Sequence, residues 1–290
     1  MWVSDGTEGG TVMVKDIRSG STGSSPGGFV AGTSSLYFFA NDGTNGKELW
    51  TSDGTDAGTY LVKNLVAGAS GQTVNSGHFQ GDVLNGVLYL SMTTGSGFDL
   101  MRTDGTSDGT YLVKNLPSSS SDAIVNRLIV SSNGYLYFVG NSDAGNSNEI
   151  SLWRSDGTTE GTVPIHQLKT TSSESANIGL VPTTRGIYYS FDHPLYGYEW
   201  WYTDGFSTTS TPLADIGSDT IDGAYASNTI VSSGSGYNSR GNQYENVGET
   251  LYFVGFDSEN GRELWKTDGT PEGTYLAADI SEGISSSLAL

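Results

Sequence analysis

Six aspartates at a recurring position are the first candidates for chemistry in this sequence. Each opens an Asp-Gly step: Asp5, Asp53, Asp104, Asp156, Asp204 and Asp268. Carboxylates bind Ca²⁺, but that ion takes about six to eight oxygens, so one aspartate per turn suffices only if backbone carbonyls and water complete the shell. In the alternative, which we favour, each carboxylate accepts hydrogen bonds from the N–H groups of its own turn. No required cofactor is predicted, and Ca²⁺ stays open.

Aromatic residues form the second group of candidates, because flat apolar rings beside acidic and amide groups suit sugars. One column lies three residues before the aspartates: Trp2, Trp50, Trp153, Trp201 and Trp265, with Met101 in the remaining unit. Residues that occupy the same place in every unit are predicted to pack between units. The better candidates for ligand binding break the repeat: Tyr196 and Tyr198 beside His193, and Tyr225, Tyr237 and Tyr244.

Signals for an enzyme are weak. The three histidines, His78, His166 and His193, fall in different units and lack the spacing of metal ligands or of a catalytic triad. The sequence contains no cysteine, which excludes disulfides, thiolate metal sites and cysteine nucleophiles. Acidic residues that recur before one strand are predicted to belong to the scaffold: Glu48, Asp99, Glu199 and Glu263. We predict no catalytic residues and do not expect an enzyme.

The elements that position these residues come from a repeat that runs through the chain. Eleven residues after each aspartate stands Asp, Asn or Gln, followed directly by Ile or Leu. A fixed offset through a turn predicts a β-hairpin of fixed geometry. Six such hairpins are expected, at residues 2–17, 50–65, 101–116, 153–168, 201–216 and 265–280.

Four short strands are predicted in one unit, for which residues 28–65 serve as the example. They are runs of aromatic and β-branched residues bounded by Gly, Asn, Asp and Ser, near 29–31, 36–40, 48–52 and 59–63. The second strand recurs five times, against six for the hairpin. Units of about 50 residues with four antiparallel strands are typical of β-propeller blades. We therefore expect an all-β protein, one repeat domain over residues 1–290.

The repeated phrase resembles that of a known family. Residues 48–55, Glu-Leu-Trp-Thr-Ser-Asp-Gly-Thr, and residues 263–270, Glu-Leu-Trp-Lys-Thr-Asp-Gly-Thr, are similar to the repeat of the bacterial ELWxxDGT-repeat proteins, and the resemblance covers nearly the whole chain. The blade order is also similar to that of kelch repeats, although the kelch di-glycine is missing. The resemblance implies large, secreted or surface-exposed proteins with propeller-like repeats and no assigned reaction. Departures occur at Met101, at Ser151 and in residues 206–209.

Six angular positions are expected if the ring closes. With five, the hairpin at 265–280 would have to occupy the place of the hairpin at 2–17. The sixth blade would take its outer hairpin from residues 2–17 and an inner strand from residues 287–290, with one strand missing. An open arc cut from a longer array is the alternative.

One insertion interrupts the repeat. The spacing from Trp201 to Trp265 exceeds that between the earlier members of this column, Met101 included, and the excess falls in residues 217–248, which are rich in Ser, Gly, Asn and Tyr. Insertions into repeats map to loops on one face, often the binding face. An insertion that is tolerated without any role is the alternative.

The charge excludes two classes of partner. The formal net charge is -19, from 32 acidic against 13 basic residues, and such a field repels nucleic acid and anionic lipid. No apolar run reaches the roughly 20 residues that span a bilayer. We expect a non-catalytic extracellular or cell-surface module for adhesion or scaffolding, with a protein partner or self-association. The alternative is a carbohydrate-binding, lectin-like or glycan-processing propeller.

Overall fold

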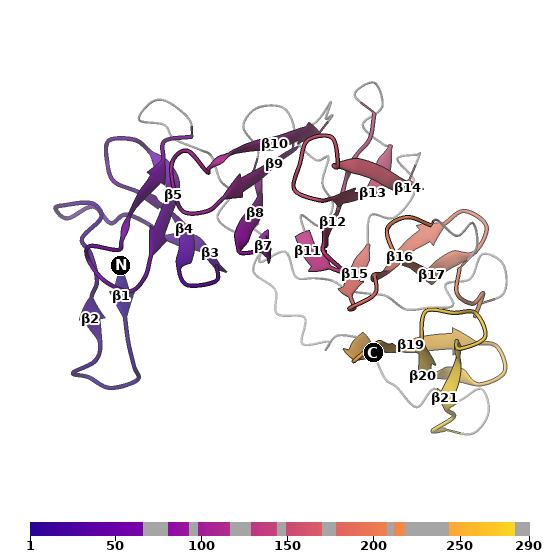
Figure 1. The fold of residues 1–290 in the computed structure, drawn as a ribbon. Coiled ribbons are helices and arrows are strands. Elements are labelled where there is room, and N and C mark those ends of the chain that lie inside the picture. Colours follow the sequence, from indigo (N-terminus) through magenta and orange to yellow (C-terminus); the bar gives the residue numbers. More distant parts are fainter. Residues whose placement is uncertain are drawn as a thin grey trace. The chain divides into compact units, whose positions relative to one another are not determined.

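The computed structural model describes residues 1–65, 81–92, 98–116, 129–143, 149–169, 178–207, 212–217 and 244–281. Within these residues every regular element is a β-strand, and the strands form six antiparallel sheets (Figure 1). This confirms the all-β prediction. The chain divides into two compact units, one of residues 1–117 with 157–159 and one of residues 118–156 with 160–290. The described part of the chain holds no helix long and apolar enough to cross a membrane.

The first unit contains three sheets. A two-stranded sheet pairs β1 (Trp2–Val3) with β2 (Val12–Met13). Two four-stranded meanders follow, the first of β3 (Gly27–Ala31), β4 (Leu36–Asn41), β5 (Lys47–Ser52) and β6 (Tyr60–Lys63), the second of β7 (Gly81–Leu84), β8 (Val87–Met92), β9 (Phe98–Thr103) and β10 (Tyr111–Leu116). The strands predicted for residues 28–65 agree with β3 to β6 to within two residues at each end.

The second unit also contains three sheets. The four-stranded sheets are β11 (Ile129–Ser132), β12 (Tyr135–Asn141), β13 (Ile150–Ser155) with β14 (Val163–Lys169), and β18 (Tyr244–Val247), β19 (Thr250–Asp257), β20 (Gly261–Thr267) with β21 (Tyr275–Ala278). Between them in sequence lie β15 (Gly179–Pro182), β16 (Ile187–His193) and β17 (Gly197–Thr203). On the free edge of β17 the N–H of Leu213 donates to the carbonyl of Trp200 at 2.9 Å, where the repeat places a fourth strand.

The inner strands of the sheets from β3 to β17 are buried on both faces, which explains their continuous apolar runs, whereas burial alternates along β19. On β4, Phe38 packs with Ile17 and Trp50 in one cluster, while Tyr37 and its neighbour two residues on pack against the sheet of β7 to β10. In the second unit the sheet of β15 to β17 likewise packs against a sheet on either face. The prediction that thin sheets bury their faces against neighbours is confirmed within each unit. Residues 287–290, expected to supply an inner strand, lie outside the described residues.

The Asp-Gly-Thr motif forms a self-contained turn. The carboxylate of Asp53 accepts hydrogen bonds from the N–H and the hydroxyl of Thr55, at 2.9 and 2.7 Å. The Thr55 hydroxyl accepts one from the N–H of Gly58 at 2.9 Å, and Gly54 takes a φ of +91°, which glycine adopts without strain. The same bonds recur at three other turns, around Asp5, Asp104 and Asp268. The interpretation of these aspartates as turn acceptors is confirmed.

The periodic glutamates are buried acceptors for the backbone. Glu48 and Glu263 are both 0% exposed. The Glu48 carboxylate accepts the N–H of Leu65 at 2.8 Å, and that of Glu263 accepts the N–H of Ile280 at 2.9 Å. They hold the chain where it leaves the last strand of each sheet, so their periodicity belongs to the scaffold, as predicted.

Polar contacts between the sheets of the first unit use a repeated lysine. The ammonium groups donate to backbone carbonyls in the next repeat: Lys15 to Asp56 at 2.8 Å, Lys63 to Thr110 at 2.6 Å and Lys114 to Thr159 at 3.3 Å. Each lysine stands ten residues after the aspartate of its own turn. A cation aimed at turn carbonyls joins successive repeats without needing a particular side chain in the next one.

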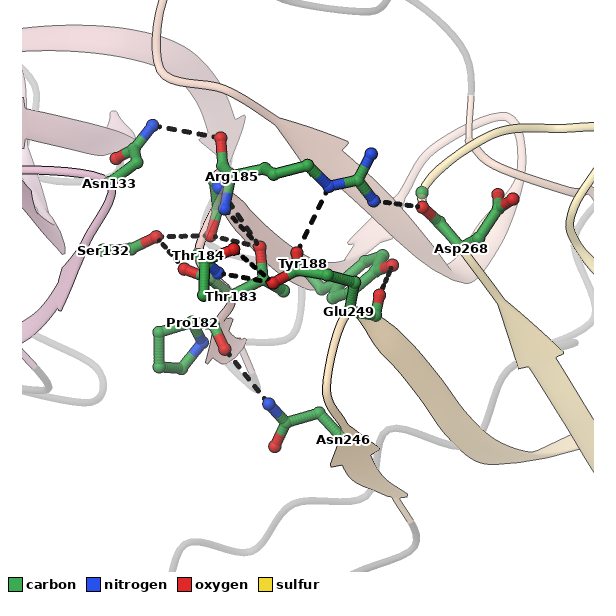
Figure 2. A network of polar contacts seen from close by, with 12 residues as sticks. Ser132, Asn133, Pro182, Thr183, Thr184, Arg185, Tyr188, Asn246, Glu249 and Asp268 are labelled. Carbon is green, nitrogen blue, oxygen red and sulfur yellow. Dashed lines mark hydrogen bonds and ion pairs between the residues drawn. The ribbon is translucent and has the colours of Figure 1, made fainter.

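The second unit uses a polar network around the turn between β15 and β16 (Figure 2). On one side the hydroxyl of Ser132 donates to the carbonyl of Thr183 at 2.6 Å. On the other, Glu249 accepts the N–H of Thr184 at 2.9 Å and pairs with Arg185 at 3.3 Å. Arg185 also donates to the carbonyl of Asp268 at 3.0 Å. The turn thus connects the sheets on both of its sides through hydrogen bonds and one ion pair.

Candidate functional site

Two turns show how the repeat connects its second and third strands. In the turn between β4 and β5, the Asp42 carboxylate accepts the N–H of Thr44 at 2.8 Å and the side-chain amide of Asn45 at 2.7 Å. In the turn between β19 and β20, Asp257 accepts the side-chain amide of Asn260 at 2.8 Å. An aspartate and an asparagine three residues apart therefore hold these turns closed.

The turn between β16 and β17 departs from this rule. Counted back from the glycine that ends each turn, His193 stands in place of the aspartate and Tyr196 in place of the asparagine. His193 still accepts a backbone hydrogen bond, from the N–H of Leu195 to its Nδ1 at 3.1 Å. In the other turns the asparagine side-chain amide donates a hydrogen bond to the aspartate; here ring stacking replaces that hydrogen bond. The ring centroids of His193 and Tyr196 are 4.9 Å apart, and the ring planes are inclined at 29°.

Phe191 is the second departure on this sheet. In two other sheets the same place is held by glycine, and the tryptophan of the third strand lies against it. Trp153 donates from Nε1 to the carbonyl of Gly140 at 3.1 Å, and a Cβ built on Gly255 would lie 2.5 Å from the Trp265 indole. A phenylalanine side chain fills this space, so the indole on this sheet must pack ring against ring.

Trp201 is that indole, and it lies at the centre of the aromatic rings. Its ring centroid is 5.2 Å from Phe191, 5.6 Å from His193 and 6.2 Å from Tyr196. The side chain is 1% exposed. Among the described residues its Nε1–H finds no hydrogen-bond partner, which is an uncommon state for a buried donor.

His166 on β14 is the third departure. The place ten residues after the turn aspartate is lysine in the first three repeats: Lys15, Lys63 and Lys114. The Nδ1 of His166 lies 2.5 Å from the hydroxyl of Tyr189, and its ring is 5.4 Å from that of Trp201. Burial lowers the pKa of His166, and the nearby His193 lowers it further. The histidine is therefore neutral at pH 7 and packs as a ring where the lysines act as charged donors.

These five residues, His166, Phe191, His193, Tyr196 and Trp201, are called the aromatic cluster. Two sheets of the second unit supply it. Phe191 and Trp201 form a buried floor, while His166, His193 and Tyr196 are half-buried and Leu195 beside them is 68% exposed. A stacked pair of rings at an exposed turn offers a flat surface with ring N–H and hydroxyl groups at its edge, which suits a sugar ring.

The structure separates the tyrosines that the sequence proposed as ligand-binding. Tyr196 belongs to the aromatic cluster. Tyr198 is 7% exposed and packs with Trp200 on the opposite face of the sheet, and Tyr244 joins that second cluster at 5.0 Å from Trp200. Tyr225 and Tyr237 lie outside the described residues, as does most of the insertion at 217–248.

Sequence reasoning missed two members of the cluster. His166 and Phe191 are separated by 25 positions in the chain and are joined only by packing, with their rings 5.6 Å apart. A signal was present: His166 stands where three repeats have lysine, and Phe191 stands where two sheets have glycine.

The aspartates do not gather into a metal centre. Among the described residues no group of three or more His, Cys, Asp or Glu side chains is placed to hold a metal ion. The hydroxyl and N–H of Thr55 hold the pKa of Asp53 below its usual value, because they donate to the ionised form. Those bonds occupy one carboxylate oxygen within the turn. That no cofactor is required, with Ca²⁺ left open, stays a prediction.

No protein-family model matches the sequence, and no curated protein matches it. Several solved structures resemble it at low identity. An α-L-arabinofuranosidase from Clostridium thermocellum is 17% identical, with 64% of this chain and 72% of that chain covered and a TM-score of 0.34. A neuraminidase-like protein of A/flat-faced bat/Peru is 11% identical, with 97% of this chain and 78% of that chain covered and a TM-score of 0.42. A prolyl endopeptidase is 7% identical with a TM-score of 0.48, and the match spans 88% of this chain but only 35% of the endopeptidase.

These comparisons correct one sequence-based interpretation. A non-catalytic module for adhesion or scaffolding was expected, and the comparisons contradict it, since the chain resembles an arabinofuranosidase and a neuraminidase-like protein. We do not keep that interpretation. The likeness by itself assigns no substrate or activity to this chain.

Proposed function

We propose that this chain is a carbohydrate-binding protein of the β-propeller type, and that the sugar lies on the aromatic cluster. The observation that carries the proposal is the exchange of the Asp–Asn pair for the stacked pair of His193 and Tyr196. The Asp–Asn pair closes two other turns of the chain with hydrogen bonds alone. When two half-buried rings replace this pair, the turn loses the hydrogen bond between the two side chains. It gains a flat surface at the rim of the sheet.

The surroundings of the cluster support a role in recognition. The charged groups of the repeat are absent from it, because His166 replaces the lysine and His193 replaces the aspartate. Glu199, which pairs with Phe191 across the strands, accepts the N–H groups of Ile216 and Gly217. Neutral rings with donors at their edges bind sugars through stacking and hydrogen bonds without a formal charge.

The propeller architecture is part of the same proposal. Support comes from four-stranded meanders whose inner strands are buried on both faces within each unit. Six positions with one incomplete blade remain our interpretation, with the two-stranded sheet of β1 and β2 as the outer half of that blade. Membership of the ELWxxDGT-repeat proteins and a secreted or surface location are proposed on the repeated motif alone.

A glycan array tests the proposal. The wild-type chain, Tyr196→Ala and a matched control, Tyr275→Ala, are applied at pH 7.5 with and without EDTA. Tyr275 is 48% exposed, belongs to the same unit and lies outside the cluster. We expect the wild type and the control to bind the same sugars, and Tyr196→Ala to lose binding about tenfold or more, since an aromatic contact is worth roughly 1.5 kcal/mol.

Two outcomes would contradict the proposal. One is an array without any bound sugar for the wild type, and the other is equal binding by Tyr196→Ala. The EDTA arm decides separately whether Ca²⁺ is needed, because a chelator removes the ion without touching the rings.

A further inference from the structure

The acceptor that closes the β16–β17 turn differs in kind from its counterparts. In the β4–β5 turn it is the carboxylate of Asp42. Burial alone raises the pKa of Asp42, but hydrogen bonds from Asn45 and Thr44 more than offset this and hold it below its usual value. That carboxylate therefore accepts hydrogen bonds throughout the neutral and mildly acidic range. In the β16–β17 turn the acceptor is the Nδ1 atom of His193, which accepts only while it carries no proton.

We propose that His193 is the positioning residue of the sugar site and makes sugar binding dependent on pH: neutral His193 holds the turn and presents Tyr196, and protonated His193 releases both. The inference rests on the proposed function for the sugar, while the behaviour of the turn stands on the geometry alone.

Protonation of His193 places two hydrogen-bond donors opposite each other. The Nδ1 atom gains a hydrogen that points at the N–H of Leu195, 3.1 Å away, so the bond that closes the turn is replaced by repulsion. The imidazole must rotate to relieve it. Because the ring of His193 stacks on that of Tyr196 at 4.9 Å, the rotation also removes the support of the tyrosine. The surface for the sugar is then lost.

The groups around His193 favour a single protonation. Among the described side chains, Tyr196 in the turn stacks on His193, His166 on β14 feels its charge, and Tyr189 on β16 contacts His166. Burial lowers the pKa of the half-buried His166, and charge on His193 lowers it further. Burial raises the pKa of Tyr189. The transition at acid pH is therefore assigned to His193.

The size of the effect follows from the neutral fraction of His193. If only the neutral form presents the site, the apparent affinity falls in proportion to this fraction as the pH is lowered.

The chain itself suggests the matched variant. His193→Asp restores the carboxylate acceptor of the β4–β5 and β19–β20 turns and removes the imidazole, including the ring that stacks on Tyr196. The first measurement uses NMR without any ligand and follows the Leu195 amide and the Tyr196 ring protons from pH 7.5 to 5.0. We expect both to shift together in the wild type and in His166→Gln, and neither to shift in His193→Asp.

The second measurement repeats the glycan array at pH 7.5 and pH 5.0, with circular dichroism at both values to confirm folding. We expect the wild type to bind more weakly at pH 5.0 than at pH 7.5. We expect His193→Asp, which lacks the ring that stacks on Tyr196, to bind more weakly than the wild type at pH 7.5 but equally at both pH values. The inference is overturned if Leu195 and Tyr196 do not respond to pH, or if His193→Asp responds as the wild type does. An empty array with an intact NMR transition would instead count against sugar binding and leave the role of His193 in the turn standing.

Discussion

The carboxylate of Glu48 accepts a hydrogen bond of 2.8 Å from the backbone N–H of Leu65, 17 residues later in the chain. Glu263 and Ile280 repeat the contact at 2.9 Å with the same spacing. The glutamate that begins the Glu-Leu-Trp phrase is thus a buried acid. It accepts a hydrogen bond from a backbone N–H where the chain leaves the last strand of its sheet. This hydrogen bond explains why the acid recurs although it contacts no solvent.

Replacement of Glu48 by alanine removes the acceptor that the partly buried N–H of Leu65 uses. We expect a loss of about 2 to 3 kcal/mol in the free energy of unfolding, measured by urea denaturation. Glu48→Gln is the matched control, because its amide oxygen still accepts, and should lose about 1 kcal/mol or less. Equal losses for the two variants would show that the hydrogen bond to Leu65 is not what Glu48 contributes.

The second glycine of the Asp-Gly-Thr turn, Gly58, is predicted to be preferred for a steric reason. A Cβ built on Gly58 would overlap the Asp53 carboxylate. Gly58→Ala should therefore destabilise the protein by about 1 to 3 kcal/mol, observed as a lower melting temperature. The neighbouring change Ala57→Gly serves as control and should cost less than about 1 kcal/mol. A melting temperature for Gly58→Ala equal to that of the control would refute the packing of Asp53 against this glycine.

Glu249 should make the protein sensitive to acid. The hydroxyl and N–H of Thr184, with help from Arg185, lower the pKa of Glu249 to about 2 from an ordinary value of 4.5. A depressed pKa stabilises the folded state fully above pH 4.5, and the contribution is lost as the pH falls from 4.5 towards 2. In Glu249→Gln this part of the pH dependence should disappear, as seen in melting temperatures between pH 5 and 2.

The exposed Glu245 provides the control for that experiment. Glu245→Gln should keep the acid sensitivity of the wild type, because no hydrogen bond of its carboxylate to the network around Thr184 is lost. If Glu249→Gln and the wild type follow the same curve below pH 4.5, the network of Figure 2 does not stabilise the second unit through this carboxylate.

Arg154 contacts Phe206, one of the residues that depart from the motif. Its guanidinium lies over two rings, 4.2 Å from the centroid of Phe206 and 4.9 Å from that of Tyr135, and donates to the carbonyl of Gly205 at 2.8 Å. Lysine lacks the flat, delocalised cation that packs against aromatic rings. Arg154→Lys should cost about 1 kcal/mol in urea denaturation.

Arg102 is the matched control for this change, since its guanidinium lies over a single ring, that of Tyr111, at 4.9 Å. Arg102→Lys should cost clearly less than Arg154→Lys. Equal costs would mean that the second ring, supplied by Phe206 where the motif has threonine, adds nothing.

Much of the fold could be predicted because its determinants are local. The turn around Asp53 is closed by bonds within the stretch from Ser52 to Thr59, whose hydroxyls lie 2.6 Å apart. Such contacts span only a few residues, so a repeated phrase is enough to specify them. The strands of residues 28–65 could be placed within two residues for the same reason.

The candidate site was predicted only in part. Tyr196 and Tyr198 are two residues apart and looked equivalent, yet they lie on opposite faces of the sheet. Tyr196 belongs to the turn, where the regular alternation of side chains does not hold, whereas Tyr198 belongs to β17. The sequence could not reveal which tyrosine would meet His193.

The sequence by itself determined the periodic part of this protein: the strands, the turns closed by aspartate and threonine, and the buried acids of each sheet. Tertiary structure decided which aperiodic residues meet, as with His166 and Tyr189, which are 23 positions apart and touch only because two sheets pack face to face. The physical reason is the range of the interactions. Hydrogen bonds within a turn are set by neighbours in the chain, whereas a ring finds its partner only after two sheets have chosen the faces that they bury.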